Sequence, residues 1–195
     1  MPDDPAVRKR ALRAEIRERR RIMPAAERER ANAAIGRGLV ALAEERGASS
    51  VAAYLSTPQE PSTREFLDWA LDTGVRVLLP VSRADGLLDW AAYDGKDEGL
   101  DWMGMPQPTT ELLSPLAVND VDLIVVPAAA IDRSEMRMGW GRGYFDRTLG
   151  SMAQRPPVYA VVFDPEIVEA VPVEAQDEPV DGAVTPSGTV VFPMD

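Results

Sequence analysis

The sequence predicts an α/β fold, a three-layer sandwich with a mostly parallel central sheet, preceded by N-terminal helices. From residue 50 onward, short apolar runs typical of buried strands alternate with helical segments, which is the pattern of a sheet covered by helices. After Asp122, the run to Val126 is wholly aliphatic, as in a central strand. The 195 residues suffice for one sizeable core, and no repeat or low-complexity linker interrupts them. We therefore expect a single domain over residues 1–195.

Two helices are expected before the sheet begins. Residues 5–21 place Leu12 and Ile16 on one face of a helix that is otherwise rich in Arg and Glu. This segment can be interpreted either as a solvated surface helix or as a helix that binds phosphate. Pro24 suits the first turn of a second helix, and Gly47 suits its end. The apolar stripe of that helix consists of Ala31, Ile35, Leu39 and Leu42.

The remaining elements follow in order along the chain. Short apolar runs predict strands over 50–56, 75–79, 88–93, 122–126, 158–163, 183–185 and 189–192. Ser62 and Glu65 predict a capping box for a helix through Asp72, and the segments 144–149 and 165–170 predict two more helices. Residues 94–119, rich in Gly, Pro and acids, predict a long surface loop. Because ligands bind at the carboxyl ends of parallel strands, the loops after 50–56 and 122–126 are expected to face one site.

The composition excludes several classes of function. The chain has no cysteine and no histidine. A thiolate nucleophile, a Ser-His-Asp triad and a zinc site of the usual His/Cys kind are therefore excluded. Acid–base work falls to Asp, Glu, Lys, Tyr or the substrate itself. If the protein binds a metal, the absence of Cys and His leaves oxygen ligands, so a hard cation held by carboxylates and phosphates is expected, and Mg²⁺ is such a cation.

Charge and hydropathy bear on location and partners. The net charge is −11, although residues 1–46 carry 12 Lys/Arg against 8 Asp/Glu. An acidic body argues against nucleic-acid binding, whereas the basic N-terminal segment can supply phosphate contacts. No apolar run approaches the roughly 20 residues of a transmembrane helix, and the acidic N-terminus lacks the features of a secretory signal. We expect a cytoplasmic monomer that binds small molecules, with no nucleic-acid or membrane partner.

A glycine-rich run follows the predicted central strand. Its three glycines lack a Cβ, so backbone N–H groups can approach an anion closely, and the helix that follows adds a favourable dipole. The run also holds three arginines and the carboxylate of Asp146, as a Mg²⁺-bridged phosphate requires. The residues concerned are Gly139, Gly141, Gly143, Arg137, Arg142 and Arg147. The spacing matches neither a Walker A loop nor a dinucleotide fingerprint. A tight turn between strand and helix is the alternative, and the charged residues favour a phosphate site.

The run Arg137–Arg147, RMGWGRGYFDR, resembles the R-L-G-x-G-[KRG]-G-Y-Y-D-[RA] signature of the 5-formyltetrahydrofolate cyclo-ligase family, also called methenyltetrahydrofolate synthetases. The resemblance covers nearly the whole chain. Other segments similar to the family pattern are Lys9–Arg13, Leu55–Glu60, Trp102 with 106–108, Asp122–Pro127, Phe163, 171–172, Asp177 and 184–185. Several motifs in the right order are more specific than any one of them.

The resemblance implies an activity and a fold. Enzymes of this family convert 5-formyltetrahydrofolate and ATP to 5,10-methenyltetrahydrofolate, ADP and phosphate, and they use Mg²⁺. The reaction passes through an N5-iminium phosphate, and the protein mainly positions the reactants and neutralises charge. The implied architecture is a NagB/RpiA/CoA-transferase-like sandwich.

The resemblance also implies roles for individual residues. ATP binding is implied for Lys9, Arg13, Arg137, Gly139, Trp140, Gly141, Arg142, Gly143, Tyr144 and Phe145. Substrate binding is implied for Leu55, Glu60, Trp102 and Tyr144, and Mg²⁺ binding for Asp146 and Asp177. The alternatives are ordinary surface or capping carboxylates for the two aspartates, a solvated loop acid for Glu60 and a core or lid anchor for Trp102.

The chain departs from the family pattern in three places. The segment Ala128–Met136 lacks the glycines that the family has before the loop, so this turn is expected to be built differently. Phe145 stands where the family has Tyr, and Trp140 is bulky at a variable position. These departures support an alternative, a non-catalytic folate- or nucleotide-binding module on the same scaffold. A third hypothesis is a sugar-phosphate isomerase or CoA-transferase, against which the Lys9/Arg13 pair and the glycine loop favour ATP.

Overall fold

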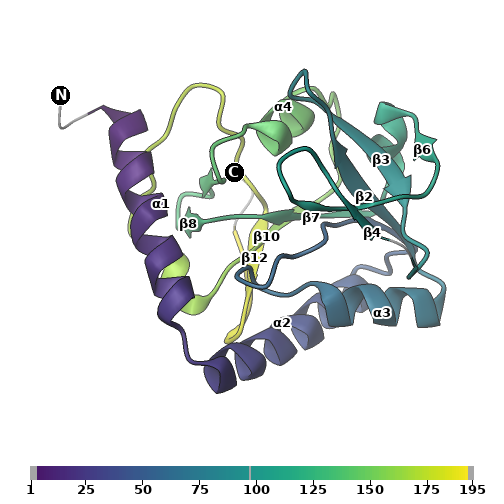
Figure 1. Ribbon diagram of the computed structural model, residues 1–195, viewed down its shortest axis with the longest axis horizontal. Helices are drawn as coiled ribbons and strands as arrows, with labels where there is room; N and C mark the ends of the chain where they lie inside the picture. Colours follow the sequence, from purple (N-terminus) through teal and green to yellow (C-terminus); the bar gives the residue numbers. More distant parts are fainter. Residues whose placement is uncertain (1–3, 97, 193–195) are drawn as a thin grey trace.

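The computed structural model describes residues 4–96 and 98–192 and contains a large mixed sheet. Its eight strands lie in the order β13-β12-β10-β7-β1-β2-β3-β6 (Figure 1). Their bounds are β1 (Ser50–Ala52), β2 (Arg76–Ser82), β3 (Leu88–Ala92), β6 (Leu112–Leu113), β7 (Leu123–Pro127), β10 (Val158–Val161), β12 (Gly182–Thr185) and β13 (Gly188–Val191). The strands from β12 to β2 run parallel, whereas β13 on one side and β3 and β6 on the other pair antiparallel. The parallel arrangement is thus confined to the centre, where β7 confirms the predicted central strand.

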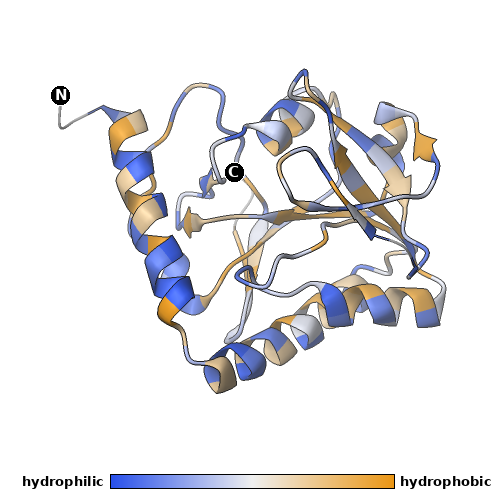
Figure 2. Ribbon diagram, viewed as in Figure 1, coloured by the Kyte–Doolittle hydropathy of each residue, from blue (hydrophilic) through white to orange (hydrophobic). Residues whose placement is uncertain are grey.

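Helices cover both faces of this sheet. On one face lie α2 (Ala25–Glu45) and α3 (Arg64–Thr73), and their apolar side chains form one core with β1, β7 and β10. On the other face, η1 (Pro115–Asp120) and α4 (Tyr144–Gly150) contribute Val118 and Leu149 to a second core. Figure 2 shows mostly apolar strands in the middle and helices that alternate polar and apolar residues. Within the described residues, no helix is long and apolar enough to cross a bilayer.

The first helix, α1 (Pro5–Ile22), stands apart from both layers (Figure 1). It packs on a three-stranded sheet with the order β11-β8-β9, formed by β8 (Ala130–Asp132), β9 (Arg137–Met138) and β11 (Ile167–Val168). Ile16 is fully buried in this contact, in one cluster with Ala129 and Met138, and Leu12 packs against the same cluster. Because the contact is small, a narrow apolar face is enough to hold the helix, and the rest of its surface is free for charged residues.

A buried ion pair also attaches α1 to the segment after β10. Arg20 is 2% exposed, and its Nε and Nη2 donate to the two carboxylate oxygens of Glu166 at 2.7 and 2.8 Å. The same Nη2 donates to the carbonyl oxygen of Ala128 at 3.0 Å. Glu166 lies in η2 (Asp164–Glu166), is 4% exposed, and accepts a further bond from the Phe163 backbone N–H. One arginine therefore joins α1, the end of β7 and the end of β10.

Two predicted features between residues 50 and 72 differ from the structure. The strand predicted over 50–56 ends at Ala52, after which the Ala53 N–H donates once to Leu78 and the chain continues buried but unpaired. The predicted capping box is absent, because α3 begins at Arg64 with Thr63 as N-cap and without a side-chain cap. The Thr63 hydroxyl donates to the Tyr54 carbonyl oxygen at 2.6 Å instead. That bond ties the extended segment to the helix.

Three later predictions are also corrected. Residues 94–119 are not an unstructured loop, because they contain the hairpin of β4 (Glu98–Leu100) and β5 (Pro106–Pro108), followed by β6 and η1. The segment 165–170 forms η2 and β11 rather than a helix. Strand β2 continues through Pro80 to Ser82. Among the described residues, only β3 pairs with β2 beyond Leu78, so Pro80 lies where one side of the strand has no described partner strand, a position that tolerates proline.

Removing the carboxylate of Glu166 is expected to destabilise the fold strongly. In Glu166→Ala the Arg20 guanidinium stays buried without its counter-charge, which costs about 3–5 kcal/mol in other proteins. Urea unfolding measures the loss in the free energy of unfolding. Glu169→Ala, at an exposed glutamate three residues away, is the matched control and is expected to change stability by less than about 0.5 kcal/mol. Equal effects of the two substitutions would contradict the role given to the pair.

Candidate active site

Two adjoining cavities open at the carboxyl ends of the parallel strands. The first, of about 390 Å³, is lined by residues that follow β1, by the end of β2 and by Pro127 at the end of β7. The second, of about 440 Å³, lies against α1 and the segment 174–177. Arg17, Gly139, Trp140, Gly143 and Asp146 line both cavities. The predicted meeting of the loops after 50–56 and 122–126 is confirmed, and the glycine loop forms the wall between the two spaces.

Glycine is favoured at each of the three positions of the loop for a different physical reason. The Arg137 guanidinium lies beneath the loop, and a Cβ on Gly139 would stand 2.7 Å from its Nη1. Gly141 and Gly143 have φ angles of 96° and 69°, in the left-handed region that favours glycine. Gly143 is also the N-cap of α4. The three glycines therefore reflect one close approach, between Gly139 and the Arg137 guanidinium, and two positions where the backbone turns in a left-handed conformation.

Arg137 supports the loop from a buried position and also lines the first cavity. It is 3% exposed, and its Nη1 donates to the Pro127 carbonyl oxygen at 3.1 Å. Its Nη2 donates to Asp146 Oδ1 at 2.6 Å. The arginine thereby fixes the end of the central strand relative to the first turn of α4. The carboxylate of Asp146, which lines both cavities, is held in place by this bond.

The turn before the loop is built on Asp132, which compensates for the absent glycines. Asp132 Oδ1 accepts bonds from the Ser134 N–H and hydroxyl at 2.9 and 2.7 Å and from the Met136 N–H at 3.2 Å. Its Oδ2 accepts from the Val171 N–H at 2.8 Å. Glu135 takes a φ of 72°, the left-handed conformation in which glycine is otherwise preferred. The departure in Ala128–Met136 thus changes how the turn is made and leaves the loop in place.

The second cavity is lined by paired charges. Lys9 is buried, and its Nζ contacts Glu174 Oε2 at 2.6 Å and Asp177 Oδ2 at 2.5 Å. Arg13, four residues along the same face of α1, donates from Nε to the Gly139 carbonyl oxygen at 2.7 Å. Burial and then the charge of Arg17 lower the pKa of Arg13 from its usual value. The basic face of α1 therefore crowds positive charge against the glycine loop, and an anion would relieve that crowding.

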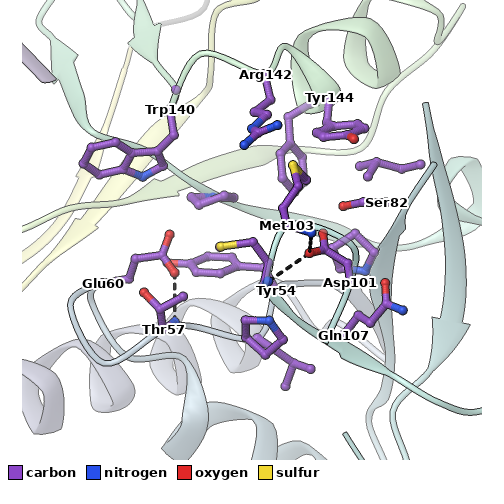
Figure 3. Close-up of a pocket in the computed structure, with 18 of the residues that line it drawn as sticks. Tyr54, Thr57, Glu60, Ser82, Asp101, Met103, Gln107, Trp140, Arg142 and Tyr144 are labelled. Atoms are coloured by element: carbon purple, nitrogen blue, oxygen red, sulfur yellow. Dashed lines mark hydrogen bonds between the residues drawn. The ribbon is translucent and has the colours of Figure 1, made fainter. Parts of the chain in front are cut away.

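The first cavity combines apolar walls with a few polar groups (Figure 3). Leu55 and Glu60 both line it and are 4% and 8% exposed. Glu60 Oε2 accepts a bond from the Thr57 N–H at 2.9 Å, so the side chain points back across the loop. Tyr144 lines the opposite wall and donates its hydroxyl to the Arg83 carbonyl oxygen at 3.0 Å. Such a cavity suits a flat, largely apolar molecule with a small number of hydrogen-bonding groups.

Trp140 stands between the two cavities. The guanidinium carbons of Arg17 and Arg20 lie 5.1 and 4.9 Å from the centre of its ring. Both contacts are cation–π interactions, which orient an aromatic ring as well as stabilise it. The bulky residue at this position is therefore packed against α1, and its indole forms part of the shared wall.

The structure gathers almost all of the predicted site residues around these two cavities. Lys9, Arg13, Gly141 and Asp177 line the second cavity, whereas Arg142, Tyr144 and Phe145 line the first. Trp102 is the exception, because its side chain is 66% exposed and it lines neither cavity. The Arg142 guanidinium carbon lies 5.5 Å from the centre of its ring. Trp102 is thus neither a core residue nor, in this structure, in contact with the cavity.

Sequence reasoning missed several residues that line the cavities. They are Arg17, Arg20, Tyr54, Gln59, Asp101, Gln107 and Glu174. Arg17 and Arg20 continue the spacing of Lys9 and Arg13 along one face of a helix, so that periodicity was a usable signal. Gln107 lies inside a segment that matches the family pattern. Glu174 carried no signal, because it meets Lys9 across 165 residues of chain.

Comparison with known proteins identifies the family. A model of the 5-formyltetrahydrofolate cyclo-ligase family matches residues 5–186. A 5-formyltetrahydrofolate cyclo-ligase of Mycolicibacterium smegmatis is 35% identical over 185 residues, covering 92% of this chain and 94% of that protein. The enzyme of the same name from Escherichia coli K12 is 31% identical over 146 residues, covering 72% and 79%. This chain belongs to the 5-formyltetrahydrofolate cyclo-ligase family.

Solved structures agree in architecture. The 5,10-methenyltetrahydrofolate synthetase of Aquifex aeolicus superposes with a TM-score of 0.80 at 25% identity, covering 96% of this chain and 94% of that one. The synthetase of Mycoplasma pneumoniae has a TM-score of 0.73 at 19% identity, covering 91% and 98%. The second likeness concerns the fold alone.

The ionisation of Tyr54 tests whether its phenol, in the wall of the first cavity, is buried from solvent. Burial first, and the Glu60 carboxylate next, raise the pKa of Tyr54 well above its ordinary value of 10.0. The folded state favours the neutral phenol of Tyr54. The contribution of this phenol to the free energy of unfolding is therefore present below pH 10 and is lost as the pH rises further, because the unfolded chain ionises first. In an alkaline absorbance titration of the folded protein, wild type and Tyr54→Phe should give the same phenolate signal up to about pH 11. A smaller signal from the variant in that range would contradict the burial of the phenol.

Proposed function

We propose that this protein is an ATP- and Mg²⁺-dependent ligase that converts 5-formyltetrahydrofolate to 5,10-methenyltetrahydrofolate, with release of ADP and phosphate. The observation that carries the proposal is the pair of cavities that share the glycine loop. One suits a flat ring system and the other suits phosphate groups. Family membership supplies the identity of the reaction, and the shared wall supplies a place where a formyl oxygen meets a terminal phosphate.

The charged cavity is assigned to the phosphates of ATP. Lys9 and Arg13 project into it from one face of α1, and the backbone of Gly139–Gly143 faces them across the space. Arg137 acts beneath the loop by holding Asp146, while Arg142, Tyr144 and Phe145 adjoin the nucleotide from the side of the first cavity. Trp140 lies where the phosphate cavity adjoins the folate cavity. Backbone N–H groups and the N-terminus of α4 favour negative charge at this place.

The apolar cavity is assigned to the reduced folate. Leu55 supplies an apolar wall, and Glu60 is a hydrogen-bond acceptor for the pterin. Tyr144 presents its ring to the cavity, with its hydroxyl already held by Arg83. Trp102, exposed on the β4–β5 hairpin beside Arg142, is assigned to cover the bound folate from outside. An aromatic ring that is exposed without ligand and covered with ligand is common in binding sites.

Mg²⁺ is assigned to Asp146 and Asp177. Within the described part of the chain, no group of three or more Asp or Glu residues is arranged to hold a metal. Mg²⁺ usually takes one or two carboxylates and completes its shell with phosphate and water oxygens. Two aspartates lining the same phosphate-sized cavity fit that donor set. When bound, the ion would neutralise charge on the polyphosphate.

The proposed chemistry needs little from the protein beyond position and charge. The formyl oxygen attacks the γ-phosphorus, the bond to ADP breaks, and an N5-iminium phosphate forms. The folate N10 then attacks the activated carbon, loses its proton, and phosphate leaves with the former formyl oxygen. Arg13 and Lys9 neutralise the transferring phosphoryl group, and the shared wall holds N10 beside the carbon. No histidine is required, which agrees with a chain that has none.

The activity is tested with the purified protein, ATP, Mg²⁺ and 5-formyltetrahydrofolate, by the near-ultraviolet absorbance of the methenyl product. Asp146→Asn is expected to lower turnover at least about 100-fold, because it removes negative charge where the metal and phosphates meet. Asp72→Asn, on the exposed surface of α3, is the matched control and should keep full activity. A fully active Asp146→Asn protein would refute the role of Asp146. Binding of folate and ATP by wild type without product would favour the non-catalytic module.

The two lysines of the chain offer a second test. Lys9→Met leaves Glu174 and Asp177 facing the phosphate site without their cation, so the Kd for ATP is expected to rise about 10- to 100-fold. Lys96→Met, at the exposed lysine, should leave the Kd unchanged. Calorimetric titration with ATP and Mg²⁺ measures both. An unchanged ATP affinity in Lys9→Met would remove Lys9 from the phosphate site.

A further inference from the structure

Two buried oxygen atoms in the first cavity have no partner. They are Oδ2 of Asp101 and Oε1 of Gln107, and neither has a hydrogen-bond donor among the described residues. Both residues line the first cavity. Buried acceptors are costly to leave unpaired, and a carboxylate oxygen more so than an amide oxygen. Two of them in one cavity indicate that a ligand supplies the missing donors.

The surroundings of Asp101 show that its second oxygen is not needed to shape the hairpin. Oδ1 alone accepts the backbone N–H groups of Met103 and Met105, at 2.8 and 2.9 Å, and so closes the turn between β4 and β5 (Figure 3). Gln107 lies in the partner strand β5, where it is paired in register with Gly99 of β4. Strand pairing and the turn therefore hold both acceptors in place before any ligand arrives, which lowers the entropy cost of binding.

The two acceptors face a different part of the cavity from Glu60. Figure 3 places Glu60 beside Thr57 on one side, with Asp101 and Gln107 on the other. A tetrahydropterin carries N–H donors on more than one edge, at the 2-amino group, N3 and N8. A single carboxylate can bind only one of these edges. Glu60 therefore leaves donors of the ring unpaired, and the hairpin offers the acceptors that match them.

We propose that Asp101 and Gln107 accept hydrogen bonds from the ring N–H groups of the bound reduced folate and make the cavity selective for a 2-amino-4-oxo pterin ring. The inference rests on the proposed function, since it names how the same cavity recognises its substrate. The free oxygens, Oδ2 of Asp101 and Oε1 of Gln107, can each accept a bond from a different N–H group of such a ring, which gives geometric selectivity as well as affinity. Asp101 is thus a specificity residue on the hairpin that also bears Trp102.

The decisive variant is Asp101→Asn. Its Oδ1 keeps the turn to Met103 and Met105, while the second oxygen becomes an N–H donor that faces the donors of the ring. The Kd for 5-formyltetrahydrofolate, measured by calorimetry without ATP, is expected to rise about 10- to 100-fold. The Kd for a non-hydrolysable ATP analogue with Mg²⁺ should stay unchanged. Asp94→Asn is the matched control, because Asp94 is exposed and closes a similar turn onto the Lys96 N–H at 3.0 Å.

A second measurement separates lost recognition from a disturbed hairpin. The 5-formyl-6-methyl tetrahydropterin fragment and its 2-oxo counterpart differ at the 2-amino group. Wild type is expected to prefer the 2-amino ring, and Asp101→Asn is expected to lose that preference. If Asp101→Asn binds folate as wild type does, or weakens both rings equally, the inference is overturned while the activity assay on wild type can still succeed. If wild type binds no folate at all, the proposed function fails first.

Discussion

The site depends on the Arg137 guanidinium, which is buried beneath the glycine loop. It joins the carbonyl end of the central strand, at Pro127, to Asp146 in the first turn of α4. Because the group occupies the space under Gly139, a side chain there would collide with it. Breaking either bond would leave a buried charge or carbonyl unpaired, so the loop, the strand and the helix are constrained together. The two cavities are defined by where this unit holds the loop.

The basic face of α1 forms the wall of the second cavity that faces the glycine loop. Its charged side chains, like Arg137, are held by specific partners. Lys9, Arg13, Arg17 and Arg20 follow one another at helical spacing, and each has a defined contact. Lys9 meets two carboxylates, Arg13 a loop carbonyl, Arg17 the ring of Trp140, and Arg20 Glu166. Lys9, Arg13 and Arg17 line the second cavity, and Arg17 and Arg20 line the first. Besides its apolar contact through Ile16, α1 is therefore attached to the fold by charged groups that also line the site.

The sequence predicts those features that are encoded in contiguous residues, and it does not predict contacts between residues far apart in the chain. The helices at 5–21 and 144–149, the strand at 122–126 and the glycine loop are written in contiguous residues, and the structure confirms them. The pairing of Lys9 with Glu174 spans 165 residues and that of Arg20 with Glu166 spans 146, so no periodicity could reveal them. The hairpin within 94–119 was missed because its strands are three residues long and rich in proline and glycine. Short strands of that kind are determined by packing against β2 rather than by their own composition.

The overall acidity of the chain makes the local positive charge at α1 significant. A net charge of −11 disfavours the approach of a polyphosphate to most of the surface. Where α1 faces the glycine loop, several cations gather within one cavity, and the neighbouring carboxylates Glu174 and Asp177 offset part of the repulsion among them. An entering phosphate competes with these carboxylates for Lys9, and a cation that binds the carboxylates weakens that competition. Under the proposed assignment of Lys9 to phosphate and Asp177 to Mg²⁺, these ion pairs would couple the binding of phosphate to the binding of the metal ion.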